Sequence, residues 1–334
     1  MKFLVIGLGS MGKRRVRCLL ANKVSCKDIF GFDSKATRVQ ETVEKYAIQP
    51  VSDFDQFDFN QIDVVVISTP PDLHMHYAHL AAKRGKPMFI EAGVLEEGMQ
   101  ELIDMQKKQN LVIFPSCTMR YFPAPKKIKE ILQDGVLGKV YVWQYQSGQY
   151  LPDWHPWENV KDFYVSNRIT GGCREIVPFE LEWLVDLFGE VRNLEARKEK
   201  MANIADIDDI YLLQCKHHGG IFGQLVVDVL SRPAVRYMRI TAEKGMLIWD
   251  AGLNAISMFS AENNQWSKFS FDKGTIEKQY INPEEPYQDE IADFINCVKQ
   301  GCQPKYTVEQ DMLLLKLLYC AEQSDQQGKR INIQ

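Results

Sequence analysis

The sequence lacks the features that mark a membrane or nucleic-acid-binding protein. No apolar run reaches the roughly 18 residues that a membrane-spanning helix needs. The formal net charge is −4, whereas a surface that binds nucleic acid is basic. The apolar run Phe3–Ile6 is too short for a signal sequence and leads directly into a glycine loop. We therefore expect a cytoplasmic protein with neither a membrane nor a nucleic acid as partner.

Metal-binding patterns are also missing. The eight cysteines never form a C-x-x-C pair, and no cysteine–histidine set has the spacing of a zinc site, so we expect reduced thiols. His74, His76 and His79 lie close in sequence, but on a helix only the last two share a face. The acidic turn at residues 206–209 lacks the glycine and glutamate of a calcium loop and is interpreted as a solvated hairpin. The sequence thus predicts no bound metal.

The first third of the chain alternates short apolar runs with amphipathic segments. Strands are expected at residues 2–6, 29–32, 64–68, 88–90 and 111–115, and helices at 12–21, 38–46, 74–84 and 96–109. The run that begins at Val64 is β-branched and continuous, as in a strand buried on both faces. This order predicts an α/β domain with a doubly wound parallel sheet, a Rossmann domain, at residues 1–120.

The pattern changes after residue 120. A helix is expected at residues 124–134, and a helical stretch at 287–326 is interrupted at 301–304. Between them lie strand-like runs at 140–146, 193–198, 210–216, 221–230, 237–242, 246–250 and 255–259. Glycine-containing turns at 218–220 and 244–245 indicate hairpins. Residues 121–334 are therefore expected to form an α+β domain with a large, mostly antiparallel open sheet.

A glycine motif lies between the first strand and the first helix. In the pattern G-x-G-x-x-G, Gly7 permits a tight turn, Gly9 lets the backbone approach a pyrophosphate, and Gly12 lets the helix pack near the strand. The helix N-terminus then offers free N–H groups and a positive dipole to phosphates. We expect this loop, with Ser10 and Met11, to hold a dinucleotide.

An acidic residue follows at the end of the second strand. Asp33 lies 21 positions after Gly12, where a carboxylate accepts hydrogen bonds from the adenine-ribose hydroxyls. Because a carboxylate repels a 2′-phosphate, the sequence favours NAD. Lys35 and Arg38 are close enough in sequence to leave NADP possible.

Further motifs resemble those of a known family over the whole chain. They are V-V-I-S-T-P-P-x-x-H-x-x-x-A from residue 65, Met119-Arg120-Tyr121-Phe122, Gly135-x-x-Gly138-Lys139-Val140 and Tyr287-x-x-Glu290-Ile291-x-x-Phe294. With the glycine loop, they resemble the glucose–fructose oxidoreductase / inositol dehydrogenase / rhizopine catabolism (Gfo/Idh/MocA) family. The resemblance implies a sugar, cyclitol or sugar nucleotide bound between the second sheet and the nicotinamide, and dimer or tetramer contacts through that sheet. It adds cofactor contacts at Ser68, Thr69, Pro70, His74 and Glu91.

The catalytic pattern of the family is altered. Where the family carries Glu-Lys-Pro, this chain reads Glu91-Ala92-Gly93. Where it carries Asp-x-Gly-x-His, Glu175 stands for the aspartate and Phe179 for the histidine. Both usual acid/base groups are therefore missing.

Other residues could supply the acid/base chemistry. Glu175 is the first candidate, because an apolar setting raises the pKa of a carboxylate towards neutrality. His155 and Tyr164 follow, and an ion pair of Glu175 with Arg174 or a partner chain is the structural alternative. Candidates for binding substrate are Arg120, Trp154 and Arg168. Their alternatives are an interdomain ion pair for Arg120, and a loop anchored by tryptophans whose cations face water.

The sequence thus favours an NAD(P)-dependent oxidoreductase acting on CH–OH groups of a sugar-like small molecule, assembled as a homodimer or homotetramer. Two alternatives stay open because of the altered catalytic pattern. One is an NAD-binding enzyme without net redox chemistry, which uses a transient oxidation for elimination or hydrolysis. The other is a non-catalytic regulator that binds a dinucleotide and a sugar.

Overall fold

The computed structural model describes residues 1–154, 159–278 and 280–333. The chain forms two compact units. Unit 1 holds Met1–Thr118, Thr275–Glu277 and Asn282–Leu313, and the rest of the described chain belongs to unit 2. The chain thus first leaves unit 1 between Thr118 and Met119, close to the expected boundary at residue 120, and later returns to it.

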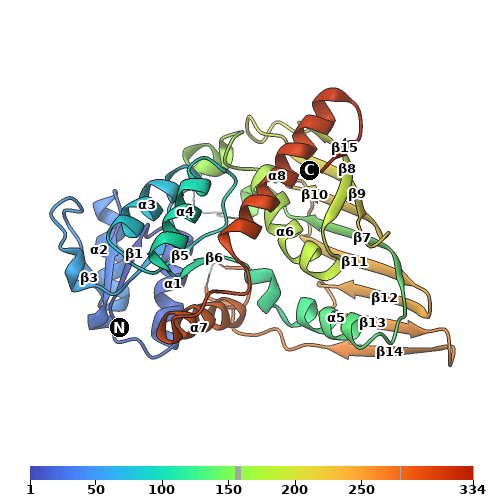
Figure 1. Cartoon of the computed structure of the whole chain (residues 1–334), viewed down its shortest axis with the longest axis horizontal. Coiled ribbons are helices and arrows are strands. Elements are labelled where there is room, and N and C mark those ends of the chain that lie inside the picture. Colours follow the sequence, from blue (N-terminus) through green and yellow to red (C-terminus); the bar gives the residue numbers. More distant parts are fainter. Residues whose placement is uncertain (155–158, 279, 334) are drawn as a thin grey trace. The chain divides into compact units, whose positions relative to one another are not determined.

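Unit 1 contains a six-stranded sheet (Figure 1). Its strands are β1 (Phe3–Ile6), β2 (Ile29–Phe32), β3 (Gln49–Pro50), β4 (Val64–Ile67), β5 (Met88–Ile90) and β6 (Ile113–Pro115), in the order β3-β2-β1-β4-β5-β6. Every pair is parallel, and Phe3 pairs with both Ile29 and Val64. All residues of β1 and β4 are apolar and buried, as expected for strands covered on both faces. The predicted doubly wound sheet is confirmed.

The helices of unit 1 come from both ends of the chain. They are α1 (Ser10–Ala21), α2 (Ala36–Tyr46), α3 (His74–Lys83), α4 (Met99–Gln109), α7 (Glu285–Gln300) and the start of α8 (Val308–Gln327). Helix α7 packs against α1. No helix of the described chain is long and apolar enough to cross a bilayer.

Unit 2 is built on a nine-stranded sheet in the order β14-β13-β12-β11-β7-β10-β9-β8-β15. The strands are β7 (Val140–Gly148), β8 (Val191–Glu199), β9 (Ile210–His217), β10 (Phe222–Asp228), β11 (Val235–Ala242), β12 (Gly245–Asp250), β13 (Ala255–Ser260), β14 (Gln265–Ser270) and β15 (Ile331–Asn332). Only β7 and β10 pair in parallel, and both expected hairpin turns are present. The predicted open, mostly antiparallel sheet is confirmed.

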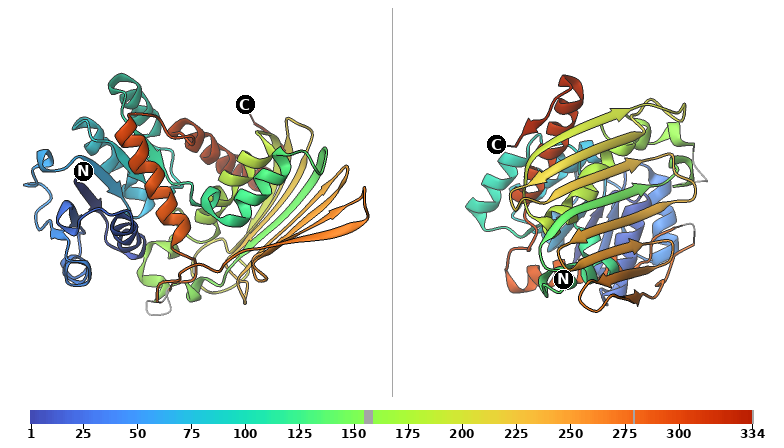
Figure 2. Two further views of the ribbon diagram at one scale, coloured as in Figure 1. Left: turned by 90° about the horizontal axis from the view of Figure 1, so that it is seen from below. Right: turned by 90° about the vertical axis from the view of Figure 1, so that its right-hand side faces the viewer.

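Helices cover one face of this sheet. Helices α5 (Pro123–Gln133) and α6 (Cys173–Phe188) lie on it, and no described element of unit 2 covers the opposite face (Figure 2). Beneath α6, the Trp183 and Tyr145 rings meet edge to face, and Trp249 stacks on Tyr145. These large buried rings fix the helix on the sheet, and with it the side chains at its N-terminus.

The acidic turn at 206–209 differs from the sequence interpretation. Asp209 is buried, and its two carboxylate oxygens accept hydrogen bonds from the backbone N–H groups of Met201 and Ala202. Asp208, also buried, forms ion pairs with Arg168 and Lys198. The prediction of a solvated hairpin was wrong, because two of the three carboxylates organise the surrounding loops.

Candidate functional site

The glycine loop of unit 1 is shaped by close backbone contacts. Gly7 has a left-handed backbone (φ +87°), and a Cβ there would lie 2.5 Å from the Ser68 carbonyl oxygen. A Cβ at Gly12 would lie 1.7 Å from the carbonyl oxygen of Gly7, which excludes any side chain. The strand, the turn and helix α1 therefore approach one another as closely as G-x-G-x-x-G implies.

The N-terminus of α1 has open space in front of it. Gly9 is the N-cap of the helix and has no side chain that could satisfy the first N–H groups. A Cβ built on Gly9 would meet only the Arg38 Nη1 atom, at 3.7 Å. The amide groups of the first helical turn, a positive helix end and this open space fit the pyrophosphate of a dinucleotide.

Asp33 lies beside this loop at the end of β2. One carboxylate oxygen accepts a hydrogen bond from Leu8 N (2.8 Å) and the other from Lys35 N (2.8 Å). The Arg38 Nη1 atom is 3.7 Å from the first of these oxygens. The carboxylate is thus fixed against the loop, and a cation that could meet a phosphate lies next to it.

The segment after β4 contributes a buried polar cluster. His74 Nε2 lies 2.9 Å from the Thr69 carbonyl oxygen, so the N–H of the neutral ring donates a hydrogen bond to that oxygen. Burial lowers the pKa of His74, with the Thr69 hydrogen bond opposing this effect, and keeps the ring neutral. The Thr69 hydroxyl is buried and has no hydrogen-bond partner among the described residues. Such an orphaned group is explained by a ligand or water that completes its hydrogen bonding.

Glu91, at the end of β5, is held by a residue that sequence reasoning missed. Arg15 of α1 is fully buried, and its Nε lies 2.5 Å from Glu91 Oε1. Arg15 Nη1 also binds Glu290 of α7, at 2.8 Å. Burial opposes the charge of Arg15, but the two carboxylates raise its pKa. An arginine on the buried stripe of α1, beside Val16 and Leu19, was the available signal.

Unit 2 brings together two predicted catalytic residues. Glu175 lies in the first turn of α6, and Tyr164 begins the short 3-10 helix η7 (Tyr164–Ser166). The Tyr164 hydroxyl donates a hydrogen bond to Glu175 Oε1 at 2.7 Å. Glu175 Oε2 is buried and has no hydrogen-bond partner among the described residues. His155, the third predicted catalytic residue, lies outside the described residues.

The environment of Glu175 changes its acidity. Burial raises the pKa of Glu175 to about 7, and the hydrogen bond from Tyr164 opposes this effect. Arg174 does not compensate the charge, because its guanidinium binds Glu322 of α8 (2.6 Å) and the Ile169 carbonyl oxygen (2.5 Å). The alternative of an ion pair between Glu175 and Arg174 is therefore wrong. At neutral pH, this carboxyl can both accept and release a proton.

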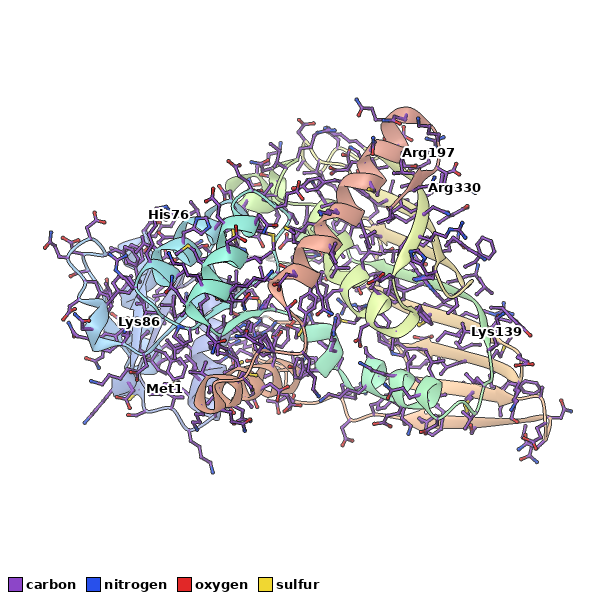
Figure 3. All side chains as sticks on the ribbon, in the orientation of Figure 1. Met1, His76, Lys86, Lys139, Arg197 and Arg330 are labelled. Carbon is purple, nitrogen blue, oxygen red and sulfur yellow. The ribbon has the colours of Figure 1, made fainter. Side chains whose placement is uncertain are left out.

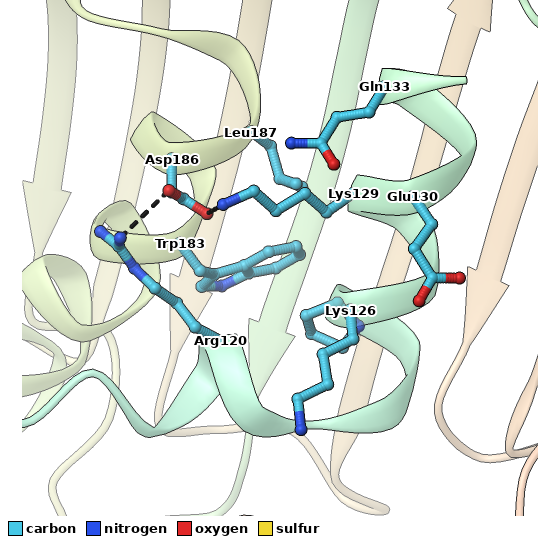
Figure 4. A pocket seen from close by; sticks show the side chains of 9 residues that line it. Arg120, Lys126, Lys129, Glu130, Gln133, Trp183, Asp186 and Leu187 are labelled. Atoms are coloured by element: carbon cyan, nitrogen blue, oxygen red, sulfur yellow. Dashed lines mark hydrogen bonds and ion pairs between the residues drawn. The ribbon is translucent and has the colours of Figure 1, made fainter. Parts of the chain in front are cut away.

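Arg120 lies in the short 3-10 helix η4 (Thr118–Tyr121) and lines a small cavity of about 180 Å³ between α5 and α6 (Figure 4). Its guanidinium binds Glu182 and, at 3.0 Å, Asp186, which also binds Lys129. All of these residues belong to unit 2, so this ion pair is not the interdomain contact considered from the sequence. A substrate would have to compete with two carboxylates for Arg120.

The other two substrate-binding candidates have different surroundings. The Trp154 indole N–H is buried and has no hydrogen-bond partner in the described part of the chain. Arg168 binds Asp206 and Asp208, each at 3.0 Å. The Trp154 N–H could therefore donate a hydrogen bond to a ligand. The Arg168 guanidinium already pairs with two carboxylates of the protein.

The histidines near residue 76 do not converge. His74 faces the Thr69 carbonyl, His79 binds the Gly98 carbonyl oxygen at 2.9 Å, and His76 is exposed (Figure 3). Among the described residues, no three histidine, cysteine or acidic side chains form a group that could hold a metal ion.

The fold and the glycine loop together define an NAD-binding oxidoreductase, and comparison with known proteins agrees. Residues 1–116 match the oxidoreductase family with an NAD-binding Rossmann fold, and residues 126–248 match the GFO/IDH/MocA C-terminal domain. The chain belongs to the GFO/IDH/MocA family of oxidoreductases.

Individual relatives are distant. Myo-inositol 2-dehydrogenase of Thermotoga maritima is 21% identical over 100% of this chain and 99% of its own length. Oxidoreductase P35 of Formosa agariphila is 27% identical over 44% of this chain, and the match spans only 47% of that protein. A levoglucosan dehydrogenase in complex with NADH has the same fold, with a TM-score of 0.86 at 16% identity over 100% of this chain and 99% of that one.

Proposed function

We propose that this protein is an NAD-dependent oxidoreductase that acts on a hydroxyl group of a sugar, cyclitol or sugar-nucleotide-like substrate. The observation that carries the proposal is the buried Glu175, whose pKa is near 7 and whose Oε2 has no partner among the described residues. The relatives named for myo-inositol and levoglucosan support the substrate class.

The cofactor is assigned to unit 1. Gly7, Gly9, Ser10, Met11 and Gly12 would hold the pyrophosphate at the N-terminus of α1. Asp33 would bind the adenine ribose, which favours NAD over NADP, and Arg38 is the cation nearest to it. The remaining assigned contacts are Ser68, Thr69, Pro70, His74 and Glu91.

In the proposed reaction, the dinucleotide held by the glycine loop would supply the acceptor for the hydride of the substrate's carbinol carbon. The Glu175 carboxylate accepts the hydroxyl proton, and in the reverse direction the acid returns it. Tyr164 positions that carboxylate through its hydroxyl, and Trp154 would donate its free indole N–H to a substrate oxygen. Arg120 and Arg168 would take part only after exchanging their present carboxylate partners.

The altered catalytic pattern supports a second candidate. Ala92 and Phe179 cannot transfer protons, and they occupy the positions of the family's usual lysine and histidine. A protein that binds NAD and a sugar without net turnover would be a regulator, or an enzyme that uses a transient oxidation. The experiment below separates these functions.

A substrate screen tests the proposed function. Wild-type protein incubated with NAD or NADP and a panel of sugars, cyclitols, uronates and sugar nucleotides is expected to form NADH from NAD, followed by absorbance. Gly9→Asp should bind NADH at least about 10-fold more weakly, because its carboxylate faces the pyrophosphate. Gly9→Ala separates the effect of charge from that of bulk: it adds only a Cβ, so any further loss of affinity in Gly9→Asp comes from the rest of the aspartate side chain and its charge. Sugar binding without NADH formation would support the second candidate and contradict the first.

We further propose that the protein is cytoplasmic and forms a homodimer or homotetramer through the open face of the unit 2 sheet. On β9, β10 and β11, large apolar side chains alternate with buried residues and are 40–59% exposed: Leu212, Phe222 and Tyr237. Trp266 of β14 is 55% exposed. Exposed apolar side chains on four strands of a sheet face that no described element of unit 2 covers support a contact between subunits there.

Sedimentation velocity tests this assembly. The wild-type protein is expected to sediment with about two or four times the 38.5 kDa mass of the chain. The double variant Phe222→Glu/Tyr237→Glu should sediment as a monomer, because its charges disrupt the apolar surface. Leu253→Glu is the control, because Leu253 is 71% exposed but lies in the turn between β12 and β13. A monomeric wild-type protein, or a double variant that stays assembled, would refute the assignment.

A further inference from the structure

The C-terminus of α7 in unit 1 ends in a Schellman motif. Gly301 follows the helix in the left-handed conformation (φ +63°). Its N–H donates to the Val298 carbonyl oxygen (3.4 Å), and the Cys302 N–H donates to the Cys297 carbonyl oxygen (3.1 Å). In this motif, the residue after the glycine donates its N–H to a carbonyl five residues earlier, and the side chains of these two residues frequently contact each other. Here, both of those residues are cysteines.

The two thiols differ in accessibility. Cys302 is exposed, and its Sγ lies 3.9 Å from the side-chain oxygen of Gln300, whereas Cys297 is only partly exposed. Burial and a hydrogen bond with the Cys302 thiol raise the pKa of Cys297 to about 12. An oxidant in solution therefore reaches Cys302 first, and the backbone hydrogen bond between the two residues keeps the Cys297 thiol in its neighbourhood.

We propose that Cys297 and Cys302 form a site of reversible oxidation, in which a hydroperoxide converts the pair to an intramolecular disulfide. The proposal is independent of the function assigned above. Cys302 acts as the peroxide-reactive residue, and Cys297 acts as the residue that resolves the oxidised intermediate.

The chemistry needs a peroxide and two thiols. The Cys302 thiolate attacks a peroxide oxygen, the O–O bond breaks, and Cys302 becomes a sulfenic acid while the peroxide is reduced to water or an alcohol. The Cys297 sulfur then forms the S–S bond, and the sulfenic oxygen leaves as water with the thiol proton. Two sulfurs are oxidised together by two electrons, and a dithiol reductant reverses the step.

Peptide mapping tests the proposal on the full-length wild-type protein. The protein is treated with hydrogen peroxide, quenched with acid and alkylated. Trypsin cleaves after Lys299, so the two cysteines fall on different peptides. The expected product is a cross-linked peptide pair that separates on reduction with dithiothreitol. If Cys302 is found as a sulfinic acid, in another disulfide or unmodified while Cys297 stays alkylated, the proposal is overturned.

Two variants define the role of Cys297. In Cys297→Ser, the same peroxide dose is expected to drive Cys302 to sulfinic and sulfonic acids that dithiothreitol does not recover. Cys26→Ser removes another partly exposed cysteine and should oxidise like wild type. Equal over-oxidation of Cys302 in wild type and Cys297→Ser would show that Cys297 does not resolve it. The wild-type map decides the question even if a variant fails to fold.

Discussion

Glu175→Gln is expected to lower kcat by about 10²–10⁴ while leaving NADH affinity unchanged, because it removes the proposed proton acceptor. The glutamine keeps the size of the side chain and can still pair with the Tyr164 hydroxyl. Steady-state kinetics with the substrate found in the screen give kcat, and a fluorescence titration gives the affinity for NADH.

The pH profile separates proton transfer from a structural effect. Oxidation requires the ionised carboxylate, so wild-type kcat should rise with pH through about 7, the pKa of Glu175. Glu175→Gln should lose this rise. Tyr164→Phe removes the hydrogen bond that lowers the pKa, so it should move the rise to higher pH.

Glu190→Gln is the matched control for these variants. Glu190 is exposed just after α6, so the same chemical change should leave both kcat and its pH profile as in wild type. A Glu175→Gln enzyme with wild-type kcat, or one that keeps the rise near pH 7, would remove Glu175 from the mechanism.

The second large effect is expected on stability. Arg15→Met should lower the free energy of unfolding by about 3–5 kcal/mol, because it leaves the buried carboxylates of Glu290 and Glu91 without their cation. Urea unfolding followed by circular dichroism measures this change. Lys13 lies on α1 like Arg15, and Lys13→Met breaks its more exposed pair with Glu41 of α2, so this variant should cost less than about 1 kcal/mol.

The sign of the pH dependence follows from Glu290. Burial raises the pKa of Glu290 in the folded protein, and Arg15 opposes this effect. Without Arg15, the folded-state pKa rises further above the unfolded value, so the folded protein binds the proton more tightly. The stability of Arg15→Met should therefore fall as the pH rises from about 5 to 8, and more steeply than that of wild type.

A charge-free variant provides the decisive comparison. Replacing Arg15 by Met together with Glu91→Gln and Glu290→Gln removes the uncompensated charges and should recover much of the lost stability. If the triple variant is no more stable than Arg15→Met, the loss comes from packing around the Arg15 side chain and not from unpaired charge.

Local patterns in the sequence were enough to predict the parallel sheet and the glycine loop. Each expected strand of unit 1 is a short apolar run, and close backbone contacts require Gly7 and Gly12 of the loop, as the spacing of the motif implies. Strand β14 was missed because most of its residues are exposed, so Gln265 to Ser270 show no alternation of buried and exposed positions. Strand β3 has only two residues and carries no periodicity.

Spacing along the sequence predicted the position of the catalytic candidate Glu175 but not the residues that contact the buried charges. Counting from Phe188-Gly189 placed Glu175 at the family's acidic position, and the structure adds its partner, Tyr164, 11 residues earlier. No local pattern could pair Arg15 with Glu290, which lies 275 residues away in sequence. Such contacts depend on how α7 packs against α1, and this packing is decided by the tertiary fold.

The return of α7 to unit 1 also affects how the protein folds as it is synthesised. The parallel sheet of unit 1 leaves the ribosome first, but the helix that neutralises Arg15 follows about 160 residues of unit 2. Until α7 docks, the nascent cofactor-binding domain contains an arginine that lacks its Glu290 partner. Unit 1 therefore starts first but is completed only after most of unit 2 has been made, and a fragment that ends near residue 118 would expose the surface of α1 that α7 covers.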